Sequence, residues 1–270
     1  MLNPNITPMS IPGIKKLAKS LKAELAIPHH EALDQAAQRG KFANYAHALH
    51  CTARRHGQIS QRLPHLVQVS AHWRNRAANT LGTERLYLPT SKPLTQLVKS
   101  HQLTGRLGGS TITGADHIAD QYHWDDADQA RWNVRRLANT LRFMDATGLR
   151  PSASHGKWPH NIYDNRIPGC DHTAVWYDPA TKRYLITDEP YTDSAEYRAD
   201  ERQLWSDKFG QVALFLDWKG LHNPSEVGGT RLFLIGKLAD AEWIASLART
   251  LDAYPGAILE KDWDRFAKPF

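Results

Sequence analysis

The sequence has little cysteine and no long apolar run. Two cysteines, Cys51 and Cys170, occur in 270 residues. This number is too small for a framework of disulfides and favours a reducing compartment. No window approaches the roughly 18 consecutive apolar residues that a membrane-spanning helix needs. The opening residues also lack an apolar segment behind a basic one, as a secretory signal would have. We therefore expect a cytoplasmic protein with no membrane partner.

Sequence motifs of several common enzyme classes are also missing. The chain has no His-Glu-x-x-His, no Gly-x-Ser-x-Gly and no Cys-x-x-Cys. The segment TGRLGGSTITG contains four glycines but lacks the lysine and the helix-opening Ser or Thr of a phosphate-cradling loop. We predict no cofactor and no resident metal, and the motifs leave open whether the chain is an enzyme.

Basic residues are concentrated at one end of the chain. The 34 Lys and Arg against 28 Asp and Glu give a net charge of +6. Residues 1–80 hold 11 of the basic residues and three acids, a local charge of +8, whereas the rest of the chain carries −2. A short basic segment on a nearly neutral body is typical of polyanion binding, because each neutralised phosphate releases counterions. A solubilising face is the alternative interpretation.

The basic segment has the pattern of three short helices. The first, over residues 10–27, places apolar side chains on one face and lysines on the other. The second is expected over residues 29–39, with Gly40 in the left-handed conformation that ends many helices. The third would run from an Asn44 cap to Gly57. Because the turn before it fits a helix-turn-helix, its outer face could enter a DNA groove, contact phosphates generally or dock a protein.

We expect the partner to be DNA or RNA, contacted through its phosphate backbone. The segment has almost no aromatic side chains, which argues against a platform for stacked bases. The side chains expected to bind nucleic acid are basic or imidazole groups of this segment: Lys15, Lys16, Lys19, Lys22, Lys41, His47, His50, Arg54 and Arg55.

The stretch HHEALDQAAQRGKFANYAHA resembles a known bacterial segment. Gly40, Phe42, Asn44 and Tyr45 match the Gly-Phe-x-Asn-Tyr-like turn of a short helical segment often labelled glyoxalase-related, here with Lys41 inserted. Together with the leader SIPGIKKLAKSLKAEL, the chain resembles proteobacterial proteins described as plasmid-related, whose C-terminal domain has no assigned function. The resemblance covers about 50 residues and implies an accessory protein of mobile genetic elements. The glyoxalase label implies a metal-dependent lyase, for which the chain shows no matching ligand set.

The remainder of the chain has a mixed pattern of strands and helices. Residues 58–80, with several arginines, are interpreted as a linker, and residues 81–270 as an α+β domain. The longest helix is expected over residues 125–148, led by acids and ended by Gly148. Strands are expected over residues 85–88, 172–177, 183–187, 211–216 and 231–235.

The clearest local pattern is the hairpin that turns at Pro179. If paired residue numbers sum to about 360, His172 lies opposite Asp188, and one step of slippage places it opposite Glu189. The open end then gathers an imidazole and carboxylates, as general acid/base chemistry or an oxygen/nitrogen metal site requires. A strand-end ion pair is the structural alternative. The candidate catalytic residues are His172, Asp188, Glu189 and Asp171, with His155 and His160 supplied by the loop 149–170.

The sequence thus predicts an α+β protein: a small three-helix module over residues 1–57, a linker over 58–80, and an antiparallel sheet of about five strands with packed helices over 81–270. The preferred function is that of a non-enzymatic, nucleic-acid-associated accessory protein. One alternative is a hydrolase or lyase, metal-assisted or not, with its site at the hairpin end. Another is a protein-docking adaptor.

Overall fold

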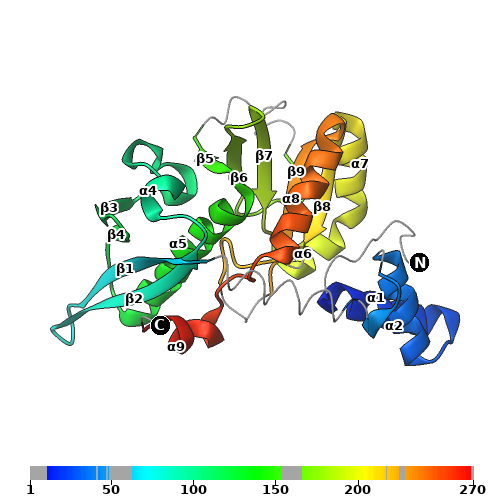
Figure 1. Ribbon diagram of the computed structural model, residues 1–270, viewed down its shortest axis with the longest axis horizontal. Helices are drawn as coiled ribbons and strands as arrows, with labels where there is room; N and C mark the ends of the chain where they lie inside the picture. The colour runs from blue at the N-terminus through cyan, green and yellow to red at the C-terminus, as the bar shows by residue number, and fades with distance from the viewer. Residues whose placement is uncertain are drawn as a thin grey trace. The chain divides into compact units, whose positions relative to one another are not determined.

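The structure is a computed structural model that describes residues 11–40, 42–46, 48, 63–153, 166–216, 218–224 and 229–268. It has a mixed α+β fold, as expected from the sequence (Figure 1). The chain divides into two compact units, Met1–Gln61 with Asp252–Pro255 and Arg62–Leu251 with Gly256–Phe270. None of the described helices is both long and apolar enough to cross a membrane.

In the first unit, two helices pack by their apolar faces. They are α1 (Ile11–Leu25) and α2 (His29–Arg39). Leu17 and Leu21 of α1 and Ala32 and Ala36 of α2 are buried in their shared core. Gly40 ends α2 with a φ of −78°, so the left-handed ending expected there is not formed. The third expected helix, over residues 44–57, falls mostly outside the described residues, so the three-helix arrangement stays a prediction.

The second unit contains two sheets rather than one. The first is four-stranded, in the order β2-β1-β4-β3. Strand β1 pairs antiparallel with β2 and parallel with β4, so this sheet is mixed. Its strands are β1 (His65–Asn75), β2 (Thr80–Thr90), β3 (Ser110–Gly114) and β4 (His117–Trp124).

Strand β1 corrects the sequence interpretation of residues 58–80 as a linker. From His65 to Asn75 the chain is a central strand, bonded on both edges. Val67, Val69 and Ala71 point into the core at every second position. Arg74 lies near the end of this strand and Arg76 just beyond it.

The second sheet is five-stranded and antiparallel throughout, in the order β5-β6-β7-β9-β8. The predicted hairpin is present as β6 and β7, and Ala174 pairs with Thr187, which is the slipped register. That register places His172 level with Glu189, just before β6 begins. The strands are β5 (Arg150–Ser152), β6 (Ala174–Asp178), β7 (Arg183–Asp188), β8 (Gln211–Leu216) and β9 (Leu232–Lys237).

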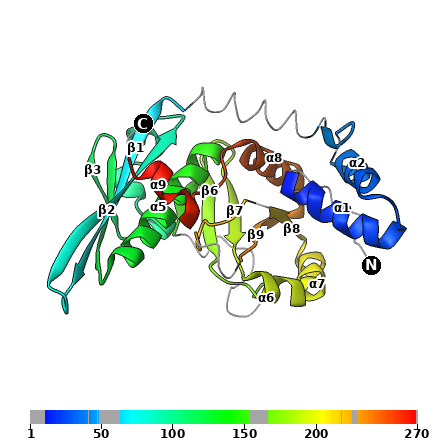
Figure 2. The same ribbon diagram turned by 90° about the horizontal axis from the view of Figure 1, so that it is seen from below.

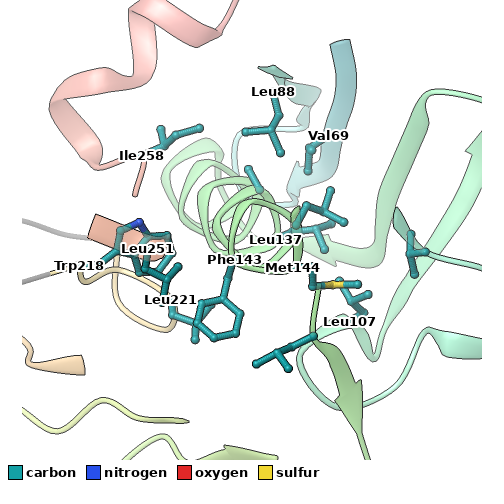
Figure 3. Packing of buried hydrophobic residues seen from close by; sticks show 14 of the residues in the cluster. Val69, Leu88, Leu107, Leu137, Phe143, Met144, Trp218, Leu221, Leu251 and Ile258 are labelled. Carbon is teal, nitrogen blue, oxygen red and sulfur yellow. The ribbon is translucent and has the colours of Figure 1, made fainter. Parts of the chain in front are cut away.

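Helix α5 (Ala127–Thr147) is central to the second unit (Figures 1 and 2). Asp126 caps its start by accepting a hydrogen bond from the Gln129 backbone N–H at 2.8 Å. Figure 3 shows Val69 and Leu88 of the four-stranded sheet on one side of it, and Trp218 and Leu221, from the segment that follows β8, on another. Because most of its sides are covered, α5 buries polar residues as well as apolar ones.

Helices cover both faces of the five-stranded sheet. Helix α8 (Ala241–Ala253) and α5 contribute to the core on one face, and Trp205 of α7 (Ala199–Phe209) packs on the other with Ile186 and Ile235. The remaining short elements are α4 (Leu94–Leu97), η1 (Ser100–Gln102), η2 (Gly105–Leu107), α6 (Thr192–Tyr197), η4 (Leu238–Asp240), η5 (Glu260–Asp262) and α9 (Trp263–Phe266).

Candidate functional site

The lysines of α1 are exposed and lie together. Their positions recur at three or four residues, so Lys15, Lys19 and Lys22 share one side of the helix, with Lys16 at its margin. The opposite side carries the buried residues that pack on α2. We call Lys15, Lys16, Lys19 and Lys22 the lysine face.

The other residues expected to bind nucleic acid cannot be placed on this face. Lys41, His47, His50, Arg54 and Arg55 lie outside the described residues. Their roles stay predictions.

A second candidate site lies at the open end of the β6–β7 hairpin. His172 precedes β6 in the left-handed region, with a φ of +58° that is uncommon for a residue with a side chain. Its neighbour Asp171 extends the hairpin, because the Glu189 backbone N–H donates to the Asp171 carbonyl at 3.0 Å. The Asp171 N–H in turn donates to Asp188 Oδ1 at 2.9 Å. These bonds hold His172 at the open end of the hairpin.

The imidazole of His172 has one nitrogen beside a carboxylate and one with no partner. Its Nδ1 lies 3.2 Å from Asp171 Oδ1. Its Nε2 is buried and has no hydrogen-bond partner in the part of the chain that the structure describes. The ring stacks on that of His222, with 3.4 Å between centroids and 12° between planes. Tyr191 meets it edge-on at 6.0 Å.

Glu189 fixes the loop that carries His222. Its fully buried carboxylate accepts hydrogen bonds from the Gly220 N–H at 2.7 Å, the His222 N–H at 2.6 Å and the Thr230 hydroxyl at 2.8 Å. Charge-assisted bonds of this kind are short and strong. Glu189 therefore positions the second ring of the stack.

Arg106 joins the two histidines from a third segment, the short helix η2. It donates to His222 Nδ1 at 2.9 Å and to the carbonyl oxygen of His172. Because Nδ1 accepts this bond, the neutral His222 ring carries its proton on Nε2. Burial lowers the pKa of Arg106 to about 10, against the opposing effect of Glu189.

Burial and neighbouring positive charges keep His222 neutral. The largest cause is burial, followed by Arg106, His172 and Arg136, and together they lower its pKa to about 3. We call Arg106, Asp171, His172, Glu189 and His222 the histidine-stack site.

Asp188 has a structural partner instead of the imidazole. It is fully buried and forms an ion pair with Arg202. Burial raises the pKa of Asp188, and the charge of Arg202 opposes that effect. The carboxylate beside His172 is thus that of Asp171, whereas the sequence placed Asp188 or Glu189 there. The catalytic roles predicted for these carboxylates stay predictions, and His155 and His160 lie outside the described residues.

The chemistry open to the histidine-stack site is proton transfer and anion binding. A ring oriented by a carboxylate, with its other nitrogen unpartnered among the described residues, can serve in proton transfer or donate to an anion. Within the described part of the chain, no group of three or more His, Cys, Asp or Glu side chains is placed to hold a metal ion. Burial raises the pKa of the neighbouring Cys170 thiol, which disfavours the thiolate needed for a nucleophile.

Sequence reasoning missed both Arg106 and His222. Arg106 lies inside the glycine-rich segment TGRLGGSTITG, whose only recognisable pattern is that of an incomplete phosphate-cradling loop. His222 lies in an irregular loop with no periodic pattern, and hydrogen bonds to Glu189 and from Arg106 bring it to the hairpin. No family model, curated protein or solved structure matches this chain.

Proposed function

We propose that the protein binds the phosphate backbone of nucleic acid through the lysine face of α1. The observation that carries this proposal is the segregation of charge on that helix. All four lysines are exposed on the side away from the core, and the described part of α1 holds a single acid, Glu24. Ammonium groups lined up in this way gain affinity by releasing counterions from the phosphate chain.

The charge distribution along the chain supports the same proposal. The first unit, residues 1–61 with 252–255, holds eight basic and four acidic residues, a charge of +4, against +2 for the much longer second unit. Its density of positive charge is therefore higher, which favours attraction of a polyanion to the first unit. The His30–Glu31 ion pair of that unit, at 3.9 Å, involves none of the four lysines. Backbone contact of this kind confers affinity without sequence preference.

The test is the salt dependence of binding by the full chain. Fluorescence anisotropy with a labelled duplex DNA of about 20 base pairs would be measured between about 50 and 200 mM salt. We expect log K to fall linearly with log salt. The triple variant Lys15→Gln, Lys19→Gln, Lys22→Gln should reduce the slope by up to about 3, because each lost contact contributes about 0.9.

A matched triple variant in the second unit controls for net charge. Lys92→Gln, Lys208→Gln and Lys237→Gln remove the same three charges from exposed positions, and we expect the slope to be unchanged. If the parent binds no duplex at about 50 mM salt, or if the control triple weakens binding as much as the α1 triple, the proposal is wrong. Absence of binding would favour the protein-docking alternative for the same face.

A further inference from the structure

The histidine-stack site contains positive charge that no described carboxylate contacts directly. Arg106 donates only to neutral acceptors, His222 Nδ1 and the His172 carbonyl. Among the described residues, the side chain of Arg136, on α5, forms one hydrogen bond, which its Nε donates to the amide oxygen of Asn133 at 3.4 Å. Neither arginine forms an ion pair among the residues that the structure describes. Partly buried guanidinium groups without an anion are costly.

The two guanidinium groups and the stacked rings lie close together. The charge of Arg136 lowers the pKa of both Arg106 and His222, so the three groups share one electrostatic environment. Trp132 links them, since its ring meets His222 edge-on at 5.7 Å and lies 5.8 Å from the guanidinium carbon of Arg136. Burial is the largest cause of the lowered pKa of Arg136.

The nearest acids are already engaged. Glu189 accepts three hydrogen bonds from the chain that it positions. Asp188 is paired with Arg202. Asp171, which is partly exposed, lies beside His172. Asp120, whose charge opposes the effect of burial on the pKa of Arg136, accepts hydrogen bonds from the Tyr122 N–H and the Trp124 indole N–H. The carboxylates near the two guanidinium groups are thus hydrogen-bonded to other groups, while the rim of the site, formed by His172 and Tyr191, remains partly exposed.

From this arrangement we propose that the histidine-stack site, together with Arg136 and Trp132, binds the phosphate group of a phosphate monoester. Guanidinium groups match phosphate geometry because they offer parallel N–H donors to its oxygens. Two guanidiniums and the Nε2–H of His222 supply donors to more than one oxygen of a dianion. The unpartnered Nε2 of His172 accepts the proton of a monoanion. Trp132 and Tyr191 flank the position with ring surface for the organic part.

The experiment is calorimetric titration of the full chain with inorganic phosphate at constant ionic strength, made up with chloride. We expect saturable binding at one site per chain. Arg136→Gln should weaken binding about tenfold or more, the loss expected when a charge-assisted hydrogen bond is removed. The control Arg85→Gln removes the same charge from an exposed position on the four-stranded sheet, and we expect it to bind like the parent.

A second measurement does not depend on how a variant folds. Phosphate bound beside His222 should raise the pKa of that ring, which NMR of the imidazole follows in the parent protein. The proposal is overturned if phosphate does not saturate the parent, if Arg136→Gln binds as tightly as the parent, or if Arg85→Gln loses as much affinity as Arg136→Gln. An unchanged His222 pKa on adding phosphate would also overturn it. Neither measurement involves the lysine face, so this proposal stands or falls independently of nucleic-acid binding.

Discussion

At the scale of single residues, His222 makes the stability of the protein depend on pH. Burial, Arg106, His172 and Arg136 lower its pKa to about 3 in the folded protein, against an ordinary value of 6.5. Between about pH 6.5 and about pH 3, the His222 ring binds a proton in the unfolded chain but not in the folded chain. The free energy of unfolding should therefore fall as the pH drops from about 6.5 towards about 3, by less than about 1.4 kcal/mol per pH unit because the ring is partly exposed.

Urea unfolding of the parent and of His222→Asn at several pH values between 4 and 7 measures this effect. Asparagine keeps an oxygen that can accept the Arg106 hydrogen bond but has no titrating ring. We expect the parent to lose more stability than the variant on acidification. Other titrating groups, Asp188 among them, are common to both proteins and cancel in the difference. Parallel pH profiles would show that His222 is not held neutral.

The hairpin end could be predicted from the sequence because its information is local. Pro179 marks the turn, and counting outward from it places His172 close to Glu189, within one step of register. Arg106 and His222 could not be found in this way. They lie 66 and 50 residues from His172 along the chain, and hydrogen bonds from Arg106 to His222 and to the His172 carbonyl, rather than periodicity, bring them together.

At the scale of elements, helices were easier to predict than strands. The apolar spacing of α1, α2 and α5 is complete within each segment, so the sequence of each segment is enough to predict its helix. Strand β4 was missed because its inward-facing Asp120 interrupts the alternation and a bulge shifts its register against β1. The parallel pairing of β1 with β4 joins segments about 50 residues apart, and no local pattern reveals that two sheets form instead of one.

At the end of α5, the cost of a left-handed backbone conformation can be measured separately from any steric clash. Gly148 was predicted to end this helix, and it does so with a φ of +73°. A β-carbon added there would meet nothing within 4 Å, so Gly148→Ala introduces no clash and only the strain of the left-handed region. We expect a loss of about 1 kcal/mol in unfolding free energy, measured by urea denaturation.

Gly256 is the matched control for that substitution. It also has open space around its β-carbon position, but its φ is outside the left-handed region. Gly256→Ala should change the unfolding free energy by less than about 0.5 kcal/mol. Equal losses at the two glycines would mean that the φ of Gly148 is not what sets the cost.

At the scale of the whole molecule, the two units have separate hydrophobic cores of unequal size. The buried core of the first unit consists largely of alanines, with Ile14, Leu17 and Leu21 as its large side chains. The second unit buries many more large residues around α5. Because small cores are marginal, removing one leucine from the first should unfold it without affecting the second.

Leu21→Ala tests this separation, and fluorescence provides the readout because all nine tryptophans lie from Trp73 onward, in the second unit. A loss of about 2 to 5 kcal/mol is expected for truncating a buried leucine. It should appear as reduced helical circular dichroism, with an unchanged fluorescence transition. The control Leu107→Ala, in the core of the second unit, should lower the fluorescence midpoint. A shift of that midpoint in Leu21→Ala would show that the two cores unfold together.

The same variant also separates the two proposed activities. Without a folded α1, the lysines no longer share one side of a helix, so Leu21→Ala should bind duplex DNA more weakly and with a shallower salt dependence. Calorimetric titration of this variant with phosphate should match the parent, because Arg106, Arg136 and His222 belong to the second unit. If Leu21→Ala retained full DNA affinity, the ordered lysine face would not be the contact. If it lost phosphate binding while the fluorescence transition stayed unchanged, the phosphate site would have to include residues of the first unit.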